Sequence, residues 1–228
     1  MSGGRKKELV ITIDGPAGAG KSTAARELAR RLGYRLVDTG ALYRGLAWAV
    51  REAKLAPEDG PSLRAVLERT TVELNGDRVL VNGRDVTREI RSPEIGDLTS
   101  QLTALRPVRD KLTPVQRGLA AGGGVVLEGR DTGSVVWPEA EVKFYLDADL
   151  ETRARRRRGE LAVRGVAAEL AAVREEVARR DRQDMGRVLA PLVKPAGAIV
   201  VDTTGRDIED VVQAMQKAVE QARCCTRS

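Results

Sequence analysis

The side chains best suited to chemistry in this sequence lie in one glycine-rich segment close to the N-terminus. The segment fits the pattern G-x-x-x-x-G-K-[ST] and consists of Gly15, Pro16, Ala17, Gly18, Ala19, Gly20, Lys21, Ser22 and Thr23. Its glycines let backbone N–H groups turn toward one anion, because no Cβ atom stands in the way. Lys21 is placed to bring positive charge to the β- and γ-phosphates, and the hydroxyl of Ser22 to ligate Mg²⁺. The pattern therefore predicts a phosphate loop that binds a nucleoside triphosphate.

The flanks of this segment are those that a phosphate loop requires. Residues 9–13 form a short, apolar and β-branched run that predicts a buried strand. Residues 23–32 place apolar side chains on one helical face, and Gly33 follows where a helix commonly ends. The new helix adds its positive N-terminal end to the anion site. A glycine-rich turn before an ordinary helix would fit the letters alone, but both flanks favour the phosphate loop.

Polar segments also follow two other predicted strands. The segment 38–40 comes directly after the strand expected at 35–37, and the helix expected over 41–52 carries Arg44 in its first turns. The segment 128–133, which contains Arg130 and Asp131, follows the strand expected at 125–127. Ligands of open α/β sheets bind beyond the carboxyl ends of the strands. We therefore expect both segments to open onto the same crevice as the phosphate loop.

The elements that must position these side chains predict an α/β protein. Core strands separated by helices are expected around Val10, Leu36, Val126, Phe144 and Val200. This alternation favours a five-stranded parallel sheet flanked by helices on both faces, within a single domain over residues 1–228. Alternating runs at 71–74 and 78–81, with the turn signals Asn75-Gly76 and Asn82-Gly83, predict a small antiparallel β insertion over about 70–88. We expect this insertion on the rim of the crevice.

A strongly basic segment lies at 150–158. Its cations are Arg153, Arg155, Arg156, Arg157 and Arg158. A charge run of this kind is usually a solvated helix face. Because it follows a predicted core strand, it can instead form a short helical lid over 151–180, in which Arg157 or a neighbour stabilises transition-state charge on the triphosphate. The sequence leaves both interpretations open.

The composition narrows the class of function. The chain has no histidine, which excludes histidine-based triads and zinc–histidine sites. No apolar run approaches the roughly 18 residues of a membrane span, and the polar N-terminus lacks the apolar stretch of a secretory signal. We therefore expect a cytoplasmic protein without a membrane partner. The net charge of +6 is compatible with nucleic acid, but aromatics make up only 3%, so no nucleic-acid partner is expected.

The cysteines, the surface pattern and the missing motifs of the sequence add little to the functional prediction. Cys224 and Cys225 are adjacent and cannot staple a fold, so we expect them in a reduced, frayed tail. No surface stripe in the sequence demands a partner, and a monomer is the expectation. A guanine-reading N-K-x-D run does not occur, which argues against a GTPase. A small chain with arginines at several crevice positions favours a kinase that acts on a small anionic acceptor.

Together these segments resemble the bacterial cytidylate kinases, which are P-loop nucleoside monophosphate kinases. The resemblance covers nearly the whole chain, and the β insertion lies where this family has its characteristic extra segment. It is carried by residues 11–23 and 38–44, Ser100-Gln101, Arg109, residues 128–133, Arg180-Asp181, Asp184, Arg187 and residues 190–192. The combination of Asp-Thr-Gly-Ala-x-Tyr-Arg with Gly-Arg-Asp is far more specific than the phosphate loop alone.

The resemblance implies transfer of the γ-phosphoryl group of ATP, with Mg²⁺, to CMP or dCMP. It implies a nucleoside-monophosphate-binding region over 39–109 and the lid over 151–180. By their positions in the sequence, the resemblance assigns Arg44, Arg130 and Arg187 to the acceptor phosphate. Cytosine is read by Ser100, Arg109 and Asp131. The sugar is contacted by Arg180 and Asp184, and Thr39, which stands where relatives often have serine, lies at the acceptor. The resemblance gives a catalytic set of Lys21, Arg130, Asp131, Arg187 and Arg157.

These implied roles agree with the chemistry of the base. Cytosine offers an exocyclic amine beside acceptor atoms, so Asp131 can accept from the amine while Arg109 donates to the acceptors. Uracil would place a carbonyl against the carboxylate, and an unsatisfied buried group costs about 1–3 kcal/mol. Phosphoryl transfer needs positioning and charge stabilisation more than a histidine base.

Two rival functions remain open from the sequence. The nearest is a kinase for another small acceptor, such as a different nucleotide or shikimate. The second is a non-catalytic, regulatory nucleotide-binding module, for example on RNA, which would bind ATP without acceptor-dependent turnover. Its nucleic-acid affinity would depend steeply on salt.

Overall fold

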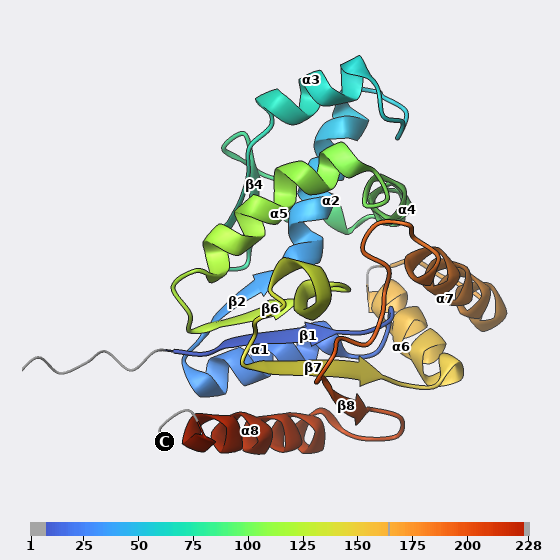
Figure 1. The fold of residues 1–228 in the computed structure, drawn as a ribbon. Helices are drawn as coiled ribbons and strands as arrows, with labels where there is room; N and C mark the ends of the chain where they lie inside the picture. The colour runs from blue at the N-terminus through green and yellow to red at the C-terminus, as the bar shows by residue number, and fades with distance from the viewer. Residues whose placement is uncertain (1–7, 164, 226–228) are drawn as a thin grey trace, which may run out of the picture.

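The computed structural model describes residues 8–163 and 165–225 of the chain (Figure 1). Its centre, within those residues, is a five-stranded parallel sheet in the order β2-β6-β1-β7-β8. The strands are β1 (Val10–Asp14), β2 (Arg35–Asp38), β6 (Val125–Glu128), β7 (Val142–Asp147) and β8 (Ile199–Asp202). The predicted parallel sheet is thus confirmed. Because the strands run the same way, their carboxyl ends meet at one edge.

Helices cover both faces of the sheet (Figure 1). One face packs against α1 (Lys21–Leu32) and α8 (Ile208–Cys225), with Phe144 of β7 fully buried between them and the sheet. The other face packs against α5 (Arg106–Ala120) and a π-helical turn (Thr132–Val136). The aliphatic side chains that the composition supplies fill both interfaces, and their burial stabilises the sheet that carries the polar strand ends.

A second lobe is built around a long helix that follows β2. It comprises α2 (Thr39–Glu52), α3 (Pro61–Arg69), α4 (Pro93–Leu102), a 3₁₀ turn (Glu89–Arg91) and a small antiparallel sheet of β3 (Val72–Asn75), β4 (Arg78–Val81) and β5 (Arg84–Asp85). The small sheet lies against α2 at Gly45, where a Cβ atom would stand only 2.8 Å from Cγ1 of Val72. It packs behind α2 and contributes no described residue to the central cavity, so its expected place on the crevice rim is wrong.

Two helices form a separate pair beside the carboxyl edge of the sheet (Figure 1). They are α6 (Leu150–Val163) and α7 (Leu170–Met185). They pack on each other through a small apolar cluster of Leu161, Val173 and Val177, and α7 also touches α4 of the second lobe. This pair has little core of its own, so its position depends on polar contacts with the rest of the chain.

Several element boundaries differ from the sequence expectation. The first turn of the small sheet is Gly76-Asp77 rather than Asn75-Gly76, because Asn75 pairs with Arg78 across the ladder. Helix α4 ends at Leu102, ahead of the helix start at Arg106. Helix α8 continues to Cys225, so the frayed tail expected at the cysteines is wrong, and the thiol of Cys224 is free and exposed. The π-helical turn carries no signal of period or composition and was not expected.

No helix in the described ranges, 8–163 and 165–225, has the length and apolar character needed to cross a membrane.

Candidate active site

One cavity lies at the carboxyl edge of the sheet and brings together nearly all the predicted site residues. Its walls come from the phosphate loop, the start of α2, the ends of α4 and β6, and the helices α5, α6 and α7. The lining includes, from the predicted set, Ala17, Gly18, Gly20, Lys21, Ser22, Thr23, Thr39, Arg44, Ser100, Arg109, Arg130, Asp131, Arg157, Arg180, Asp184 and Arg187. Gly15, Pro16 and Ala19 form the loop behind this wall.

The phosphate loop has a backbone that requires glycine at three points, Gly15, Gly18 and Gly20. Gly15 has a φ of 146°, and a Cβ atom there would lie 1.9 Å from the carbonyl oxygen of Leu146 in β7. Gly20 has a φ of 84° and ends the loop at the N-cap position of α1. These positions are left-handed or otherwise closed to L side chains. The loop therefore turns tightly against β7 and directs the N-terminus of α1 at the cavity.

Lys21 lies at the base of the loop with its ammonium group enclosed. Its Nζ donates to the carbonyl oxygen of Pro16 at 2.7 Å, and the residue is only 4% exposed. Burial lowers the pKa of Lys21 to about 7, and the positive charge of Arg130 adds to that effect. The negative charge of Glu128 raises the pKa of Lys21 and so opposes these effects. The lysine thus stands in an electropositive, desolvated position where an anion would restore its charge.

The hydroxyl of Ser22 faces a buried carboxylate that the sequence interpretation did not assign. Ser22 Oγ donates to Oε2 of Glu128 at 3.1 Å. Burial raises the pKa of Glu128, and the nearby carboxylate of Asp38 raises it further. A hydroxyl beside a carboxylate provides oxygen ligands of the kind that Mg²⁺ prefers. No group of three or more His, Cys, Asp or Glu side chains that could hold a metal ion occurs in the described part of the chain. The donors therefore fit a metal held largely by substrate phosphates.

Arginines from three separate segments gather on the opposite wall of the cavity. They are Arg44 of α2, Arg130 after β6, Arg180 of α7 and Arg187 after α7. The buried Nε atoms of Arg44, Arg180 and Arg187 have no hydrogen-bond partner among the described residues. Burial lowers the pKa of Arg180 to about 10, and the charge of Arg130 adds to this effect. Buried, partly unpaired donors of one sign are costly unless an anion satisfies them.

Asp184 is the main counter-charge of this arginine cluster. Its side chain is 1% exposed and accepts from Nε of Arg130 at 3.2 Å, while its other oxygen accepts from Arg187. Arg44 is held separately by Asp38, which accepts from its Nη2 at 2.8 Å and also caps α2. The two carboxylates orient the guanidinium groups but leave the cluster with excess positive charge. The site is thereby prepared for a multiply charged anion.

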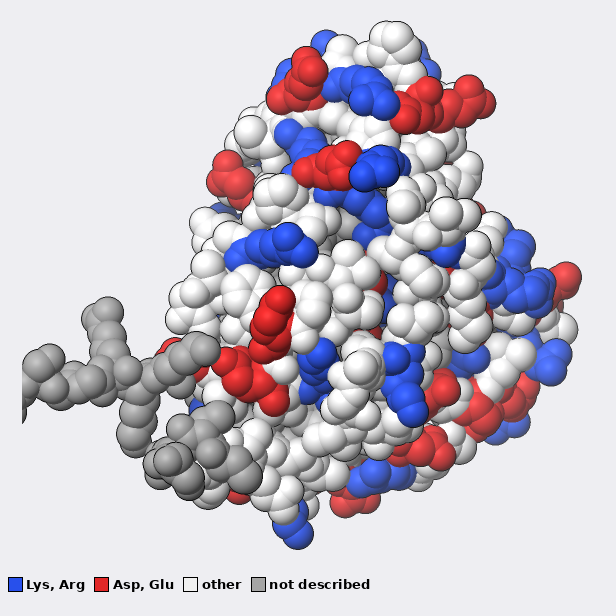
Figure 2. Space-filling model, viewed as in Figure 1, with Lys and Arg blue, Asp and Glu red and all other residues white. Residues whose placement is uncertain are grey.

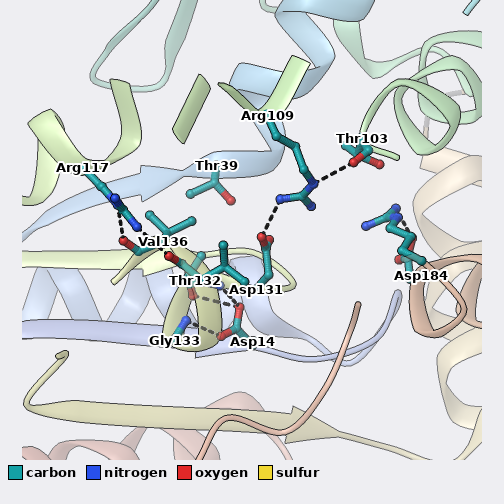
Figure 3. Close-up of polar contacts among 12 residues, drawn as sticks. Asp14, Thr39, Thr103, Arg109, Arg117, Asp131, Thr132, Gly133, Val136 and Asp184 are labelled. Carbon is teal, nitrogen blue, oxygen red and sulfur yellow. Dashed lines mark hydrogen bonds and ion pairs between the residues drawn. The ribbon is translucent and has the colours of Figure 1, made fainter. Parts of the chain in front are cut away.

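A buried ion pair closes the far end of the cavity (Figure 3). Arg109 Nη1 donates to Oδ2 of Asp131 at 2.8 Å, and the two side chains are 9% and 6% exposed. Nε of Arg109 donates to the carbonyl oxygen of Thr103 at 2.8 Å, and its guanidinium lies 5.8 Å from the ring centre of Tyr43. These contacts fix both groups in one orientation. They present a carboxylate and cationic donors side by side, as recognition of a polar base requires.

Two hydroxyl groups complete this lining. Thr39 Oγ1 donates to the carbonyl oxygen of Glu128 at 2.8 Å, so its proton is used and the hydroxyl oxygen remains available only as an acceptor. A Cβ atom at Gly129 would lie 2.5 Å from the same oxygen, and glycine is therefore needed for this approach. Ser100 of α4 is buried and contacts Oε1 of Gln183 at 3.4 Å, which ties α4 to α7 across the cavity.

Comparison with known proteins identifies the family. A sequence model of cytidylate kinases matches residues 11–221. The chain is 49% identical over 212 residues to the cytidylate kinase of Symbiobacterium thermophilum, covering 91% of this chain and 94% of that protein. It is 46% identical over 230 residues to the cytidylate kinase of Geobacter sulfurreducens, with 99% of each chain covered. The chain belongs to the cytidylate kinase family.

Solved structures agree with the fold. A shikimate kinase from Bacteroides thetaiotaomicron is similar at a TM-score of 0.50 and 16% identity, covering 93% of this chain and 98% of that chain. At this identity the likeness concerns the fold alone, and it confirms the predicted P-loop kinase architecture. Membership of the cytidylate kinase family makes the chain a phosphotransferase with nucleotide substrates.

In this cytidylate kinase family member, the arginines of the basic run in α6 differ in their surroundings. The sequence left open whether they form a solvated helix face or a lid. Arg155 and Arg158 are exposed, as a solvated face predicts. Arg157 lines the cavity and pairs with Glu160 at 3.2 Å. Arg156 donates to the carbonyl oxygen of Thr203 at 2.7 Å and is thereby tied to the loop after β8. Of the five arginines in this run, only Arg157 lines the cavity.

Arg153, the first arginine of the run, is a structural residue. It is buried, and its guanidinium donates to Oδ2 of Asp181 at 2.5 Å and to the carbonyl oxygen of Ala17 at 3.2 Å. This pairing braces the phosphate loop against α6 and α7. A pairing over this sequence separation has no local signal.

Charges of both signs are mixed over the face of the molecule drawn in Figure 2. Blue and red side chains alternate there, and no broad field of one sign covers that face. The concentration of positive charge lies instead among the arginines that line the cavity.

Proposed function

We propose that this chain transfers the γ-phosphoryl group of ATP to CMP or dCMP and releases ADP with CDP or dCDP. One observation carries the proposal. A single cavity joins the phosphate loop, an arginine cluster with unsatisfied donors, and the oriented pair of Arg109 and Asp131. The phosphate loop suits a phosphate donor, the arginine cluster suits an acceptor phosphate, and the pair of Arg109 and Asp131 suits a polar base. Catalysis of phosphoryl transfer consists largely of such positioning and charge stabilisation.

ATP is proposed to bind along residues 15–23. Backbone N–H groups of the loop and Lys21 would take the phosphates, since the loop directs the start of α1 at them. On the other side of the loop, a second hollow is lined by Gly18, Thr23, Arg156, Thr203 and Arg206. This hollow adjoins the phosphate cavity through the loop itself, and it is the proposed place of the nucleoside part of ATP.

Mg²⁺ is proposed to enter with ATP and to be held at Ser22. When bound, the ion neutralises charge that develops on the β- and γ-phosphate oxygens. Ser22 Oγ is the proposed protein ligand, and Glu128, which accepts from that hydroxyl, orients it. The sequence interpretation assigned only Ser22. Glu128 had one available signal, because it is an acidic residue at the carboxyl end of a strand next to the phosphate-loop strand.

The acceptor phosphate is proposed to bind Arg44, Arg130 and Arg187. Their guanidinium groups offer planar, charge-assisted donors that fix a phosphate strongly. Arg180 has its unpartnered Nε in the same cluster, so we extend the sequence prediction and place it near the phosphate as well as the sugar. Asp184 remains the proposed sugar contact, although its carboxylate also orients Arg130 and Arg187. Thr39 is proposed to accept a hydrogen bond beside the same acceptor.

Cytosine is proposed to be read by Asp131, Arg109 and Ser100. Asp131 accepts from the exocyclic amine, and Arg109 donates to the acceptor atoms of the ring. Because Thr103 and Tyr43 fix Arg109 from behind, the pair cannot easily rearrange to suit uracil. Mismatched buried groups of this kind discriminate by roughly tenfold to a few hundredfold per contact.

Arg157 and the surrounding lid complete the proposed catalytic set of Lys21, Arg130, Asp131, Arg187 and Arg157. We propose that residues 151–180 act as the lid and residues 39–109 as the acceptor-binding region of the single kinase domain. The small apolar core of α6 and α7 supports this role, because a pair of helices with few apolar contacts moves at low cost.

An acceptor panel tests the proposal. ADP release from ATP and Mg²⁺ is measured with CMP, dCMP, UMP, AMP, GMP and shikimate, each alone. Strong stimulation by CMP and dCMP, with little by the others, is the expected result. Stimulation by another acceptor would remove the base-reading roles of Asp131, Arg109 and Ser100 while leaving the phosphate loop in place. ATP binding without stimulation by any acceptor would favour a regulatory nucleotide-binding module.

A further inference from the structure

One buried carboxylate in the centre of the molecule has no place in the roles above. Asp14 is the last residue of β1 and is fully enclosed. Its Oδ1 accepts from the backbone N–H and the hydroxyl of Thr132, each at 2.8 Å, and its Oδ2 accepts from the backbone N–H of Gly133 at 2.7 Å. Figure 3 shows this carboxylate directly below the turn that carries Asp131. Burying a charged group costs free energy, and the three hydrogen bonds that Asp14 accepts offset part of that cost. The presence of a carboxylate at this buried position therefore requires an explanation.

Asp14 connects the two halves of the cavity, one through its neighbour in the chain and the other through its hydrogen-bond partners. Gly15, which follows it directly, begins the phosphate loop and lies against β7. Thr132 and Gly133 directly follow Arg130 and Asp131, which contribute to the acceptor half. The carboxylate therefore joins two segments that are 118 residues apart in the chain, within one residue of each functional segment.

The turn that Asp14 holds is tied to α5 on its other side, where Arg117 donates to the carbonyl oxygens of Val135 and Val136 at 3.0 Å and 2.9 Å. The nearby backbone N–H of Gly129 donates to the carbonyl oxygen of Ile13 at 3.0 Å, which aligns the start of the segment with β1. Beyond that point the chain leaves the sheet ladder and forms the π-helical turn 132–136. At Gly133 a Cβ atom would lie 2.6 Å from Oγ1 of Thr12, so glycine lets the turn approach the end of β1 closely. Asp14 supplies the polar contacts at that approach.

We propose that Asp14 is a positioning residue that holds the acceptor-binding turn in register with the phosphate loop. The inference rests on the proposed function, because the register matters only if a phosphoryl group crosses between the two halves. Displacement of the turn would move Arg130 and Asp131 together relative to the phosphate loop. Transfer depends on near in-line approach, and an error of about 1 Å can reduce the rate by about a hundredfold.

Substitution by asparagine tests this role with a minimal change of shape. In Asp14→Asn, one oxygen still accepts from Thr132, but the new amide group faces the N–H of Gly133 with a donor. We expect kcat/KM for CMP to fall by about ten- to a hundredfold, because the turn is displaced. The preference for CMP over UMP should fall by about threefold or more, because Asp131 shifts from the base. KM for ATP should stay within about twofold, because the phosphate loop keeps its contact with β7.

Two matched variants separate positioning from loss of stability. Asp85→Asn removes the same kind of contact, since Asp85 Oδ1 accepts from the N–H and the hydroxyl of Thr87 at 3.0 Å and 2.6 Å in the small sheet, away from the cavity. It should leave all kinetic constants unchanged. Leu67→Ala creates a cavity in the core of the second lobe and should lower Tm while the CMP-to-UMP ratio remains that of the wild type.

The outcomes are distinguishable from failure of the proposed function. If the wild type does not phosphorylate CMP, the proposed function is wrong. If the wild type is active and Asp14→Asn lowers Tm while KM for CMP and the CMP-to-UMP ratio stay unchanged, the positioning role is wrong. Equal increases of KM for ATP and for CMP would also overturn it. Should Asp14→Asn not fold, Thr132→Val removes one of the three contacts, and the same shift of the ratio is expected at about twofold. An unchanged ratio in that folded variant would contradict the proposal.

Discussion

The donor and acceptor halves of the cavity are built in opposite ways. The donor half is one contiguous segment, residues 15–23, which binds largely through backbone groups and the start of α1. The proposed acceptor half is made of side chains from α2, α4, α5, α7, the end of β6 and the segment after α7, with Thr39 and Arg187 at its sequence limits. A local backbone shape can be encoded in a short pattern, whereas a cluster of distant side chains depends on the whole topology. The first half is therefore recognisable from a short sequence pattern, and in the proposed function the second half selects the substrate.

The two halves share one electrostatic property. Burial and neighbouring arginines lower the pKa of Lys21 to about 7, and burial together with Arg130 lowers the pKa of Arg180 to about 10. Each half thus holds cations at the cost of desolvation and mutual repulsion. Bound phosphates would relieve both, so the free energy stored in each half becomes available on substrate binding.

The largest expected effect tests the donor half alone. Lys21→Ala should reduce kcat by about a thousandfold, since it removes the positive charge next to the migrating phosphoryl group. Steady-state ADP release with saturating CMP measures this change. Lys217→Ala, an exposed lysine of α8, is the matched control and should be unaffected. A wild-type kcat in Lys21→Ala would remove the phosphate-loop assignment.

A smaller effect tests the acceptor half alone. Asp131→Asn replaces an acceptor by a group that can also donate, so it should reduce the preference for CMP over UMP by about ten- to a hundredfold. The ratio of kcat/KM for the two nucleotides gives the result, and KM for ATP should hardly change. If the ratio is that of the wild type, Asp131 does not read the base.

A third effect concerns the lid that spans both halves. Arg157→Ala should lower kcat by about tenfold while Kd for CMP changes little, because this cation acts on charge in the transition state. Arg155→Ala, two residues away on the exposed face, provides the comparison and should match the wild type. Equal kcat values for the two variants would mean that the basic segment 150–158 is only a solvated helix face.

The smallest effect concerns Asp14, which joins the halves. Burial raises the pKa of Asp14 to about 6, with Asp131 contributing, and three hydrogen bonds only partly offset this shift. Protonation of Asp14 therefore occurs at a higher pH in the folded protein than in the unfolded chain, and the stability that it contributes at low pH is lost as pH rises through about 6. The difference in unfolding free energy between wild type and Asp14→Asn should shift in favour of the wild type by about 1 kcal/mol from pH 7 to pH 5.

Denaturant unfolding of the two proteins at both pH values measures that difference. The negative charge of Asp14 also raises the pKa of Lys21 and of Tyr145, so the measured difference includes their response to its removal. A difference that is constant with pH would mean that Asp14 titrates well below pH 5.

Much of the fold was predictable because its signals are local. The apolar strand runs, the glycine that ends α1 and the asparagine–glycine turn before β5 each act within a few residues. The π-helical turn and the extension of α8 through Cys225 were not predictable, because tertiary contacts rather than periodicity stabilise them. The small sheet was correctly expected, but its position behind α2 depends on the space that Gly45 leaves for Val72.

The sequence by itself determined the phosphate loop, the parallel sheet and the set of candidate residues, since these depend on short-range backbone geometry and on residue type. Only the tertiary structure decided which side chains meet. It paired Asp181 with Arg153, placed Glu128 against Ser22, separated Arg157 from Arg156, and set Asp14 beneath the acceptor turn. Hydrogen bonds and ion pairs are made over about 3 Å, and a distance of that scale between residues that are 28 (Arg153 and Asp181) to 118 (Asp14 and Thr132) positions apart is fixed by packing.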